Sequence, residues 1–365
     1  MTMKALFLYI SVSLIIVLSS CKGQVEFPDH KPSFSLGEEA QELPKSIWQI
    51  FQDSKGRYWF GSNGDGIFHY NGNELIRIGA KHGLLDNAIR GLQEDHLGNL
   101  YFETPKGVNK FDGKVLSKLP IQTSTNNKWQ MDSLDLWFTC NASAHDVYRY
   151  DGNSLIELEL PRQDLLTIYG YEVAGLGFRD MNNSPYAVFS IDRDNDGNLW
   201  FGTITGGAFR FDGSDFLWIG EKDLGILPDG RVPGLRSILE DKDGYIWLSH
   251  FMRKYKIEEG ASETKFKSEK GFDLSNNYGL EDIPYFNSGV LYDGNLMVST
   301  YGDGVWLFGE ENLVPIPVES GSEKAYVVSM YKDKEGRIWL ATDNGGAYYY
   351  NGAQFIKFLP LQTNH

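Results

Sequence analysis

One pattern of hydrophobic and polar positions recurs along most of the chain. Two aliphatic residues three positions apart precede an Asp-x-x-Gly turn, and an aromatic run ending in Gly-Ser or Gly-Thr follows. The first copy begins at Ile47, turns at Asp53–Gly56 and carries Trp59 in the aromatic run. This pattern predicts a β-hairpin in which Asp accepts hydrogen bonds from the turn backbone and Gly supplies a positive φ. A further Gly and a Tyr-Asn/Asp-Gly turn then predict two more strands.

Seven copies of this unit follow one another at a mean spacing of about 47 residues. Their equivalent large hydrophobic positions are Trp59, Tyr101, Trp137, Trp200, Trp247, Met297 and Trp339. A repeat of this length with four short strands is typical of one blade of a β-propeller. We therefore predict an all-β fold, a single seven-bladed β-propeller over residues 46–365, with four antiparallel strands per blade.

Three copies depart from the pattern. The third has Asp132 and Asp135 without the turn glycine, the fifth lacks Tyr-Asp-Gly after Tyr255, and the sixth has Met297 in place of Trp. Divisions into six or eight blades therefore stay open. The closure of the ring is also open, because residues 33–36 could pair with the last blade or each blade could be complete alone.

The first residues have the organisation of a signal peptide. Lys4 precedes an apolar stretch that ends at Leu18, and small residues lead to Cys21. The end of this stretch resembles a bacterial lipobox, so we predict a lipoprotein signal peptide at 1–20, lipidation of Cys21, and a tether at 21–45. A membrane-spanning anchor is the alternative, although the stretch is short for a bilayer. We expect the body to be lipid-anchored in the bacterial cell envelope, outside the cytoplasm, with the periplasmic side of the outer membrane favoured.

Composition limits the partners. The chain has 34 Lys and Arg against 49 Asp and Glu, a formal net charge of −15, and no basic run. An acidic chain of this kind repels phosphate backbones, which argues against nucleic acid as a partner. With Cys21 lipidated, Cys140 is the one remaining cysteine, which excludes a disulfide framework or a cysteine-based zinc site.

Two features that could carry chemistry are weak. The sequence from Asp192 to Gly197 matches the first half of a calcium loop, but Thr203 stands where such a loop needs an acidic ligand. His145 and His250 could share one face, but no Ser- or Cys-centred nucleophile motif accompanies them. We therefore predict no metal, no cofactor and no catalytic residues, with a propeller lyase or hydrolase as an alternative.

Blade topology suggests where a ligand could bind. If the first strand of each blade descends from an upper face, the loops between the second and third strands and the linkers between blades share that face. Two linkers, about 161–185 and 258–284, are long and aromatic, as functional loops often are. Aromatic side chains beside amides and acids suit a sugar, although they could instead pack the linkers onto the ring. The predicted ligand-binding residues are Asn63, Asp65, His145, Tyr171, Arg179, Thr205, His250, Arg253, Tyr278, Tyr301, Asp303, Asp343 and Asn344.

The repeated unit can be written I-x-x-I-x-x-D-x-x-G-x-x-W-F-G-T-x-x-G-G-x-x-x-Y-D-G. It resembles the two-component regulator propeller repeat over about residues 46–358, and the linker from Gly83 to Asn87 resembles that family's connection between blades. In the family, such propellers form the periplasmic sensors of hybrid histidine kinases, often in bacteria that degrade complex glycans. The resemblance implies the fold and, more weakly, ligand sensing.

The chain departs from the family plan in having no transmembrane helix, kinase or DNA-binding part before it ends at His365. We therefore expect a lipid-anchored binding module without a transmitter. A glycan or another small molecule is the first candidate ligand. An interaction platform for an envelope protein partner is the alternative.

Overall fold

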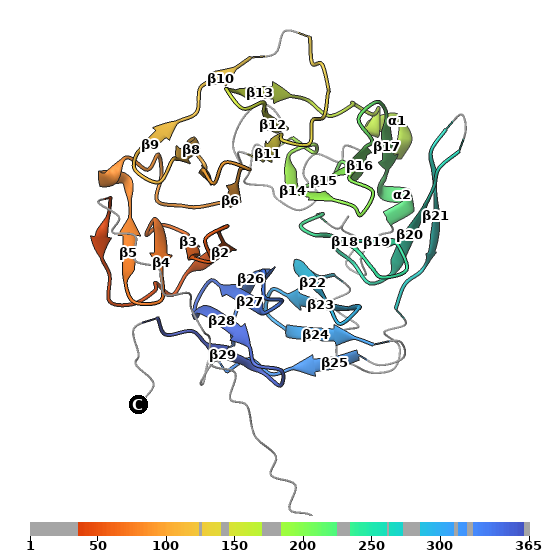
Figure 1. The fold of residues 1–365 in the computed structure, drawn as a ribbon. Coiled ribbons are helices and arrows are strands. Elements are labelled where there is room, and N and C mark those ends of the chain that lie inside the picture. The colour runs from red at the N-terminus through yellow and green to blue at the C-terminus, as the bar shows by residue number, and fades with distance from the viewer. Residues whose placement is uncertain are drawn as a thin grey trace, which may run out of the picture.

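Seven sheets surround a common centre in the computed structural model (Figure 1). The structure describes residues 36–123, 126–139, 146–169, 184–224, 234–260, 263–272, 285–309, 313–319 and 324–360. The prediction of an all-β, seven-bladed propeller is confirmed, and the divisions into six or eight blades are excluded.

Six of the blades contain four consecutive antiparallel strands, with the first strand nearest the centre of the ring, and in blade 1 a short fifth strand is added at the outer edge (Figure 1). Blade 1 contains β2 (Ile47–Gln52), β3 (Tyr58–Ser62), β4 (Ile67–Tyr70) and β5 (Leu75–Ile78); blade 2 contains β6 (Gly91–Glu94), β7 (Leu100–Thr104), β8 (Gly107–Phe111) and β9 (Leu116–Lys118); blade 4 contains β14 (Val188–Arg193), β15 (Leu199–Thr203), β16 (Ala208–Phe211) and β17 (Phe216–Ile219); blade 5 contains β18 (Ile238–Glu240), β19 (Tyr245–Leu248), β20 (Arg253–Glu258) and β21 (Lys265–Lys270); blade 6 contains β22 (Ser288–Tyr292), β23 (Asn295–Thr300), β24 (Gly304–Phe308) and β25 (Leu313–Ile316); blade 7 contains β26 (Val327–Lys332), β27 (Ile338–Thr342), β28 (Gly346–Tyr350) and β29 (Phe355–Lys357).

Blade 3 differs from the others in strand order. Its sheet contains β11 (Leu136–Phe138), β12 (Val147–Tyr150), β13 (Leu155–Leu158) and, at the outer edge, the parallel strand β10 (Ile121–Gln122). The innermost described strand, β11, carries Trp137 and therefore corresponds to the second strand of the other blades. Nearby, the Trp129 indole stacks on Trp137 and packs edge-on against Phe211 and Phe216 of blade 4. The degenerate third copy thus has a locally different architecture.

Short helices lie in three linkers between blades. They are the 3₁₀ helix η1 (Ala80–His82) and the α-helices α1 (Leu165–Tyr169) and α2 (Glu221–Leu224). In the described ranges, no helix has the length and hydropathy needed to cross a membrane.

The same hydrogen bonds fix the first turn of five blades. The Asp of each Asp-x-x-Gly turn, here called the turn aspartate, accepts a bond of 2.8–3.0 Å from an indole N–H or a phenol O–H six residues later. The turn glycines have positive φ, as predicted. The donor and acceptor pairs are Trp59 with Asp53, Tyr101 with Asp95, Trp200 with Asp194, Trp247 with Asp241, and Trp339 with Asp333.

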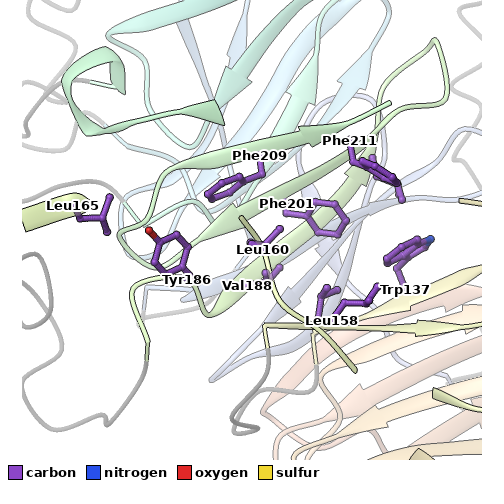
Figure 2. Close-up of a cluster of buried hydrophobic side chains, with 11 residues drawn as sticks. Trp137, Leu158, Leu160, Leu165, Tyr186, Val188, Phe201, Phe209 and Phe211 are labelled. Atoms are coloured by element: carbon purple, nitrogen blue, oxygen red, sulfur yellow. The ribbon is translucent and has the colours of Figure 1, made fainter. Parts of the chain in front are cut away.

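Buried side chains fill the space between neighbouring blades. Figure 2 shows one such cluster, in which Phe201 and Phe211 of blade 4 lie close to Trp137 and Leu158 of blade 3. Fully burying a large side chain of this kind contributes roughly 1.5–3 kcal/mol. Packing between blades is therefore the main source of stability in the ring.

The ring closes through side chains rather than through a shared strand. The Trp339 ring of blade 7 packs against Tyr58 of blade 1 at 4.8 Å between centroids, and Asp333 accepts a hydrogen bond of 2.7 Å from the Tyr58 hydroxyl. Blade 7 is complete with its own four strands. The short strand β1 (Glu38–Glu39) pairs with β5 in blade 1, while residues 33–35 lie outside the described part of the chain.

The turn aspartate generates a testable difference between two tryptophans. Trp137 Nε1 is buried and has no hydrogen-bond partner, whereas Trp200 Nε1 donates to Asp194 at 3.0 Å. Trp137→Phe removes an unsatisfied donor, but Trp200→Phe removes a donor from a buried carboxylate. We expect Trp200→Phe to lower the free energy of unfolding by about 1–2 kcal/mol more than Trp137→Phe in denaturant titrations. Equal losses would contradict the role assigned to the turn aspartate.

Candidate functional site

The upper face of the ring is the one that carries the loops between second and third strands. Near this face, the residue type at one position of the inner-strand segment varies from copy to copy. Six residues before each of the five turn aspartates, the repeat has a buried aliphatic side chain such as Ile47 or Leu235. The next residue differs from copy to copy: Trp48, Arg90, Phe189, Arg236 and Val328. Variation beside a repeated core position is what a binding surface on a common scaffold requires.

We define the upper inner rim as these strand starts together with the loop residues that contact them or lie beside them. Its members are Ser46, Trp48, Asn63, Arg90, Phe189, Arg236, Tyr301, Tyr326 and Asp343.

Asp343 connects three blades at the rim. It lies in the loop between β27 and β28, where Oδ1 accepts hydrogen bonds from Ser46 Oγ at 2.5 Å and from Trp48 Nε1 at 2.8 Å. Oδ2 accepts one from the Tyr301 hydroxyl at 3.3 Å. Burial alone would raise the pKa of Asp343, but these three bonds outweigh it and hold the pKa below its usual range. The rim therefore contains a fixed, ionised carboxylate.

Two tyrosines beside Asp343 present exposed rings. Tyr301 and Tyr326 stack with their centroids 5.4 Å apart, and 43% and 42% of their surfaces are exposed. Asn344 fixes the second ring, because its Oδ1 accepts a bond of 2.9 Å from the Tyr326 backbone N–H. Exposed aromatic faces next to a carboxylate offer both stacking and hydrogen bonding to a ligand.

Two arginines stack on aromatic rings of the rim. The Arg90 guanidinium lies 4.3 Å from the centroid of the Trp48 ring and donates to Asn63 Oδ1 at 3.1 Å. The Arg236 guanidinium lies 5.0 Å from the centroid of the Phe189 ring. Surrounding protein atoms lower the pKa of both groups by burial, although water still reaches them. Both guanidinium groups remain charged at neutral pH.

Five of the predicted binding residues belong to the rim or support it. Asn63, Tyr301 and Asp343 are members of it. Asn344 accepts a hydrogen bond from the backbone N–H of Tyr326. Asp303 forms an ion pair of 3.3 Å with Lys324, which lies two residues before Tyr326. These five lie on loops between second and third strands, as the sequence predicts.

Four others do not belong to the rim, although Asp65 lies in the same β3–β4 loop as Asn63. The Asp65 carbonyl accepts a bond from Arg77 on the outer strand β5, and Arg253 donates to Ser268 on the β20–β21 hairpin. Thr205 is only 7% exposed and His250 is fully buried. Neither Thr205 nor His250 presents a surface to a ligand, because both pack inside their blades.

The surroundings of His250 explain why it is neutral. Its Nε2 is 3.4 Å from the Tyr255 hydroxyl, and its Nδ1 has no partner. Burial lowers the pKa of the imidazole to about 3, with a smaller contribution from Arg253. The expectation of an accessible His250 is therefore corrected: the imidazole is part of the core of blade 5.

The remaining predicted residues lie outside the described part of the chain. These are His145, Tyr171, Arg179 and Tyr278 of the proposed site, and Cys21 of the proposed lipid anchor. Both long linkers are also only partly described.

Several rim residues are missing from the predicted set. Trp48, Arg90, Phe189, Arg236 and Tyr326 lie at or just before the starts of inner strands, whereas the prediction rests on loops and long linkers. The signal is nevertheless present in the sequence, because aligning the copies on the turn aspartate shows one variable position after a constant aliphatic one.

The sequence that resembles half a calcium loop is an ordinary hairpin turn. Asp194 accepts hydrogen bonds from Trp200 and Asn198 and pairs with Arg210 at 3.2 Å, so its carboxylate is fully engaged. Asp192 lies on the inner strand β14 and is exposed to solvent. Within the described residues, no three His, Cys, Asp or Glu side chains are grouped so that they could hold a metal ion.

Comparison with known families identifies the repeat. The family model of the two component regulator propeller matches residues 42–64, 183–205 and 321–344, which contain the inner strands of blades 1, 4 and 7. In these three blades the repeated unit matches the two component regulator propeller repeat. No curated protein matches the chain in sequence.

Solved structures share the propeller architecture. The extracellular domain of BT4673 from B. thetaiotaomicron, a proposed one component or hybrid two component system, matches with 18% identity and a TM-score of 0.55. That match covers 86% of this chain and 39% of the other, so this chain spans about two fifths of the BT4673 domain. Virginiamycin B lyase from Staphylococcus aureus matches with 15% identity and a TM-score of 0.56, over 85% of this chain and 97% of the lyase. At these identities, the similarity shows the fold alone.

The buried His250 gives a pH dependence that can be measured. Its pKa is about 3 in the fold against 6.5 for the ordinary imidazole, so unfolding takes up a proton as pH falls below 6.5 and stability is lost. At pH 5 this amounts to about 2 kcal/mol. We expect His250→Gln to lose about that much less stability than the wild type between pH 7.5 and pH 5.

The measurement is denaturant unfolding at a series of pH values. His96→Gln, which removes an exposed imidazole from a turn of blade 2, is the matched control. An unchanged pH dependence in His250→Gln would show that the imidazole is not held neutral by burial.

Proposed function

We propose that this chain is a lipid-anchored, extracytoplasmic, sensor-like propeller that binds a small ligand at its upper inner rim, with a glycan as the first candidate. The observation that carries the proposal is the exposed Tyr301–Tyr326 stack beside the ionised carboxylate of Asp343. Aromatic rings pack against the apolar faces of sugars, while carboxylates and amides bond to their hydroxyls. The rim supplies both kinds of group within one continuous set of contacts.

The extracytoplasmic location rests on two independent indications. The first is the predicted signal peptide and lipobox that ends at Cys21. The second is the fold that this chain shares with the BT4673 domain, which is extracellular. The lipid anchor on the periplasmic side of the outer membrane remains part of the proposal.

The rim favours a small ligand over the two alternatives. A platform for an envelope protein would be favoured by a broad apolar surface, whereas the rim alternates aromatic rings with charged groups. The lyase or hydrolase alternative rests on His145 and His250; the imidazole of His250 is enclosed, and His145 lies outside the described residues. Both alternatives become outcomes of the binding experiment.

The proposal predicts that one class of oligosaccharide stabilises the full chain, purified in detergent. A ligand at 100 times its Kd adds about 2.7 kcal/mol to the free energy of unfolding, which thermal-shift measurements detect readily. We expect Tyr326→Ala to abolish the shift, because it removes half of the exposed stack. Leu97→Ala, at a 74% exposed position in a lower turn of blade 2, is the control and should leave the shift unchanged.

Two results would count against a ligand at the rim. A shift that survives both Tyr326→Ala and Tyr301→Ala would place the ligand elsewhere. No shift with any sugar would favour the docking platform, for which cross-linking in the intact envelope is the next measurement.

A further inference from the structure

Arg236 differs from every other arginine in the described residues. The others each form an ion pair or donate at least one hydrogen bond. Arg236 has a ring contact with Phe189 but no hydrogen-bond acceptor and no carboxylate partner among the described residues. The guanidinium group is exposed to solvent, so its N–H donors bind water in the free protein and are accessible to an incoming anionic group.

The neighbourhood of Arg236 contains no competing anion. The titratable groups close enough to affect its guanidinium are the phenols of Tyr285 and Tyr301. Asp343 lies beyond Tyr301 and is already engaged by Ser46, Trp48 and the Tyr301 hydroxyl. In a chain with a net charge of −15, this is a local positive group that its surroundings leave uncompensated.

Arg90, the second arginine of the rim, is in a different state. Its guanidinium already donates to Asn63, and the carboxylates of Asp86 and Glu103 are near enough to raise its pKa against the effect of burial. The positive charge of Arg90 is therefore partly compensated within the protein. Of the two arginines, only Arg236 has N–H donors without a protein acceptor among the described residues. Tyr301 of the tyrosine stack is close enough to act on its charge.

We propose that Arg236 is the anion contact of the upper inner rim, and that the ligand is an acidic sugar whose anionic group pairs with Arg236 while its ring packs on Tyr301 and Tyr326. This inference rests on the proposed function, because it concerns the same site. The planar guanidinium offers parallel N–H donors that match a carboxylate or a sulfate in bidentate geometry. A neutral sugar would leave that charge without an anionic partner.

The test compares matched sugars on the full chain by isothermal titration calorimetry. The pairs are a glucuronate-terminated disaccharide with its glucose-terminated counterpart, and a sulfated disaccharide with its unsulfated counterpart; inorganic phosphate is the probe for a bare anion. We expect an acidic sugar to bind about 10- to 100-fold more tightly than its neutral counterpart, the range given by one or two charged hydrogen bonds. The two acidic sugars distinguish a carboxylate from a sulfate.

Three variants separate recognition from folding. Arg236→Gln should remove the preference, so that the acidic sugar binds no more tightly than its neutral counterpart. Arg236→Lys keeps the charge without the planar geometry, and should lose part of the preference with wild-type stability. Arg193→Gln removes the same charge from the lower end of β14 and should bind as the wild type does.

The outcomes separate this inference from the proposed function. Equal binding of acidic and neutral sugars, unchanged in Arg236→Gln, would overturn the anion contact and leave the glycan proposal standing. Binding of inorganic phosphate as tightly as the acidic sugar would overturn the sugar assignment. Absence of binding by any sugar is the failure of the proposed function itself. If Arg236→Gln does not fold, Arg236→Lys still decides, because an unchanged preference in that variant contradicts bidentate recognition.

Discussion

The ring depends on a carboxylate that each regular blade repeats, and that is buried in blades 1 and 7 and partly buried in the other three. The turn aspartate closes the first hairpin of the blade and, through its second oxygen, fixes an indole or phenol that packs against the neighbouring blade. One side chain thereby joins a local turn to the packing between blades. Removing its partner leaves a desolvated charge, which costs far more than the bond contributes when made. At the junction of blades 7 and 1, Asp333 also holds Tyr58, so the same interaction helps to close the ring.

Because this interaction acts at the lower turns and in the core, it leaves the upper ends of the inner strands free to vary. Where the aspartate is lost, the blade changes. In blade 3, Asp135 pairs with Arg149 instead, Trp137 has no acceptor, and the described part has no strand inside β11. In blade 6, Met297 needs no acceptor, and the turn shortens to Asp293–Gly294, both with positive φ.

The sequence was sufficient for the architecture because each blade is a local structure with its own turn chemistry. Asp53 and Gly56 predict a hairpin without knowledge of the rest of the chain, and tandem repetition then predicts the ring. The site was predicted only in part. Asn63, Tyr301 and Asp343 lie in loops, where functional residues are expected, but Trp48 lies in an inner strand and Arg236 just before one, in segments that read as scaffold. The contact between Trp48 and Asp343 depends on the closure of the ring, which brings residues almost 300 positions apart together and which no local pattern encodes.

The rim combines two charges of opposite sign, of which only the negative one has hydrogen-bond partners among the described residues. Asp343 accepts hydrogen bonds from three donors in the two neighbouring blades. It therefore links these blades and is also a potential acceptor for sugar hydroxyls. Arg236 has no such partner among the described residues and is exposed to solvent, where a ligand can reach it. A single nearby acid would have compensated its charge. The absence of that acid in the described surroundings is the physical reason to expect that the ligand supplies it.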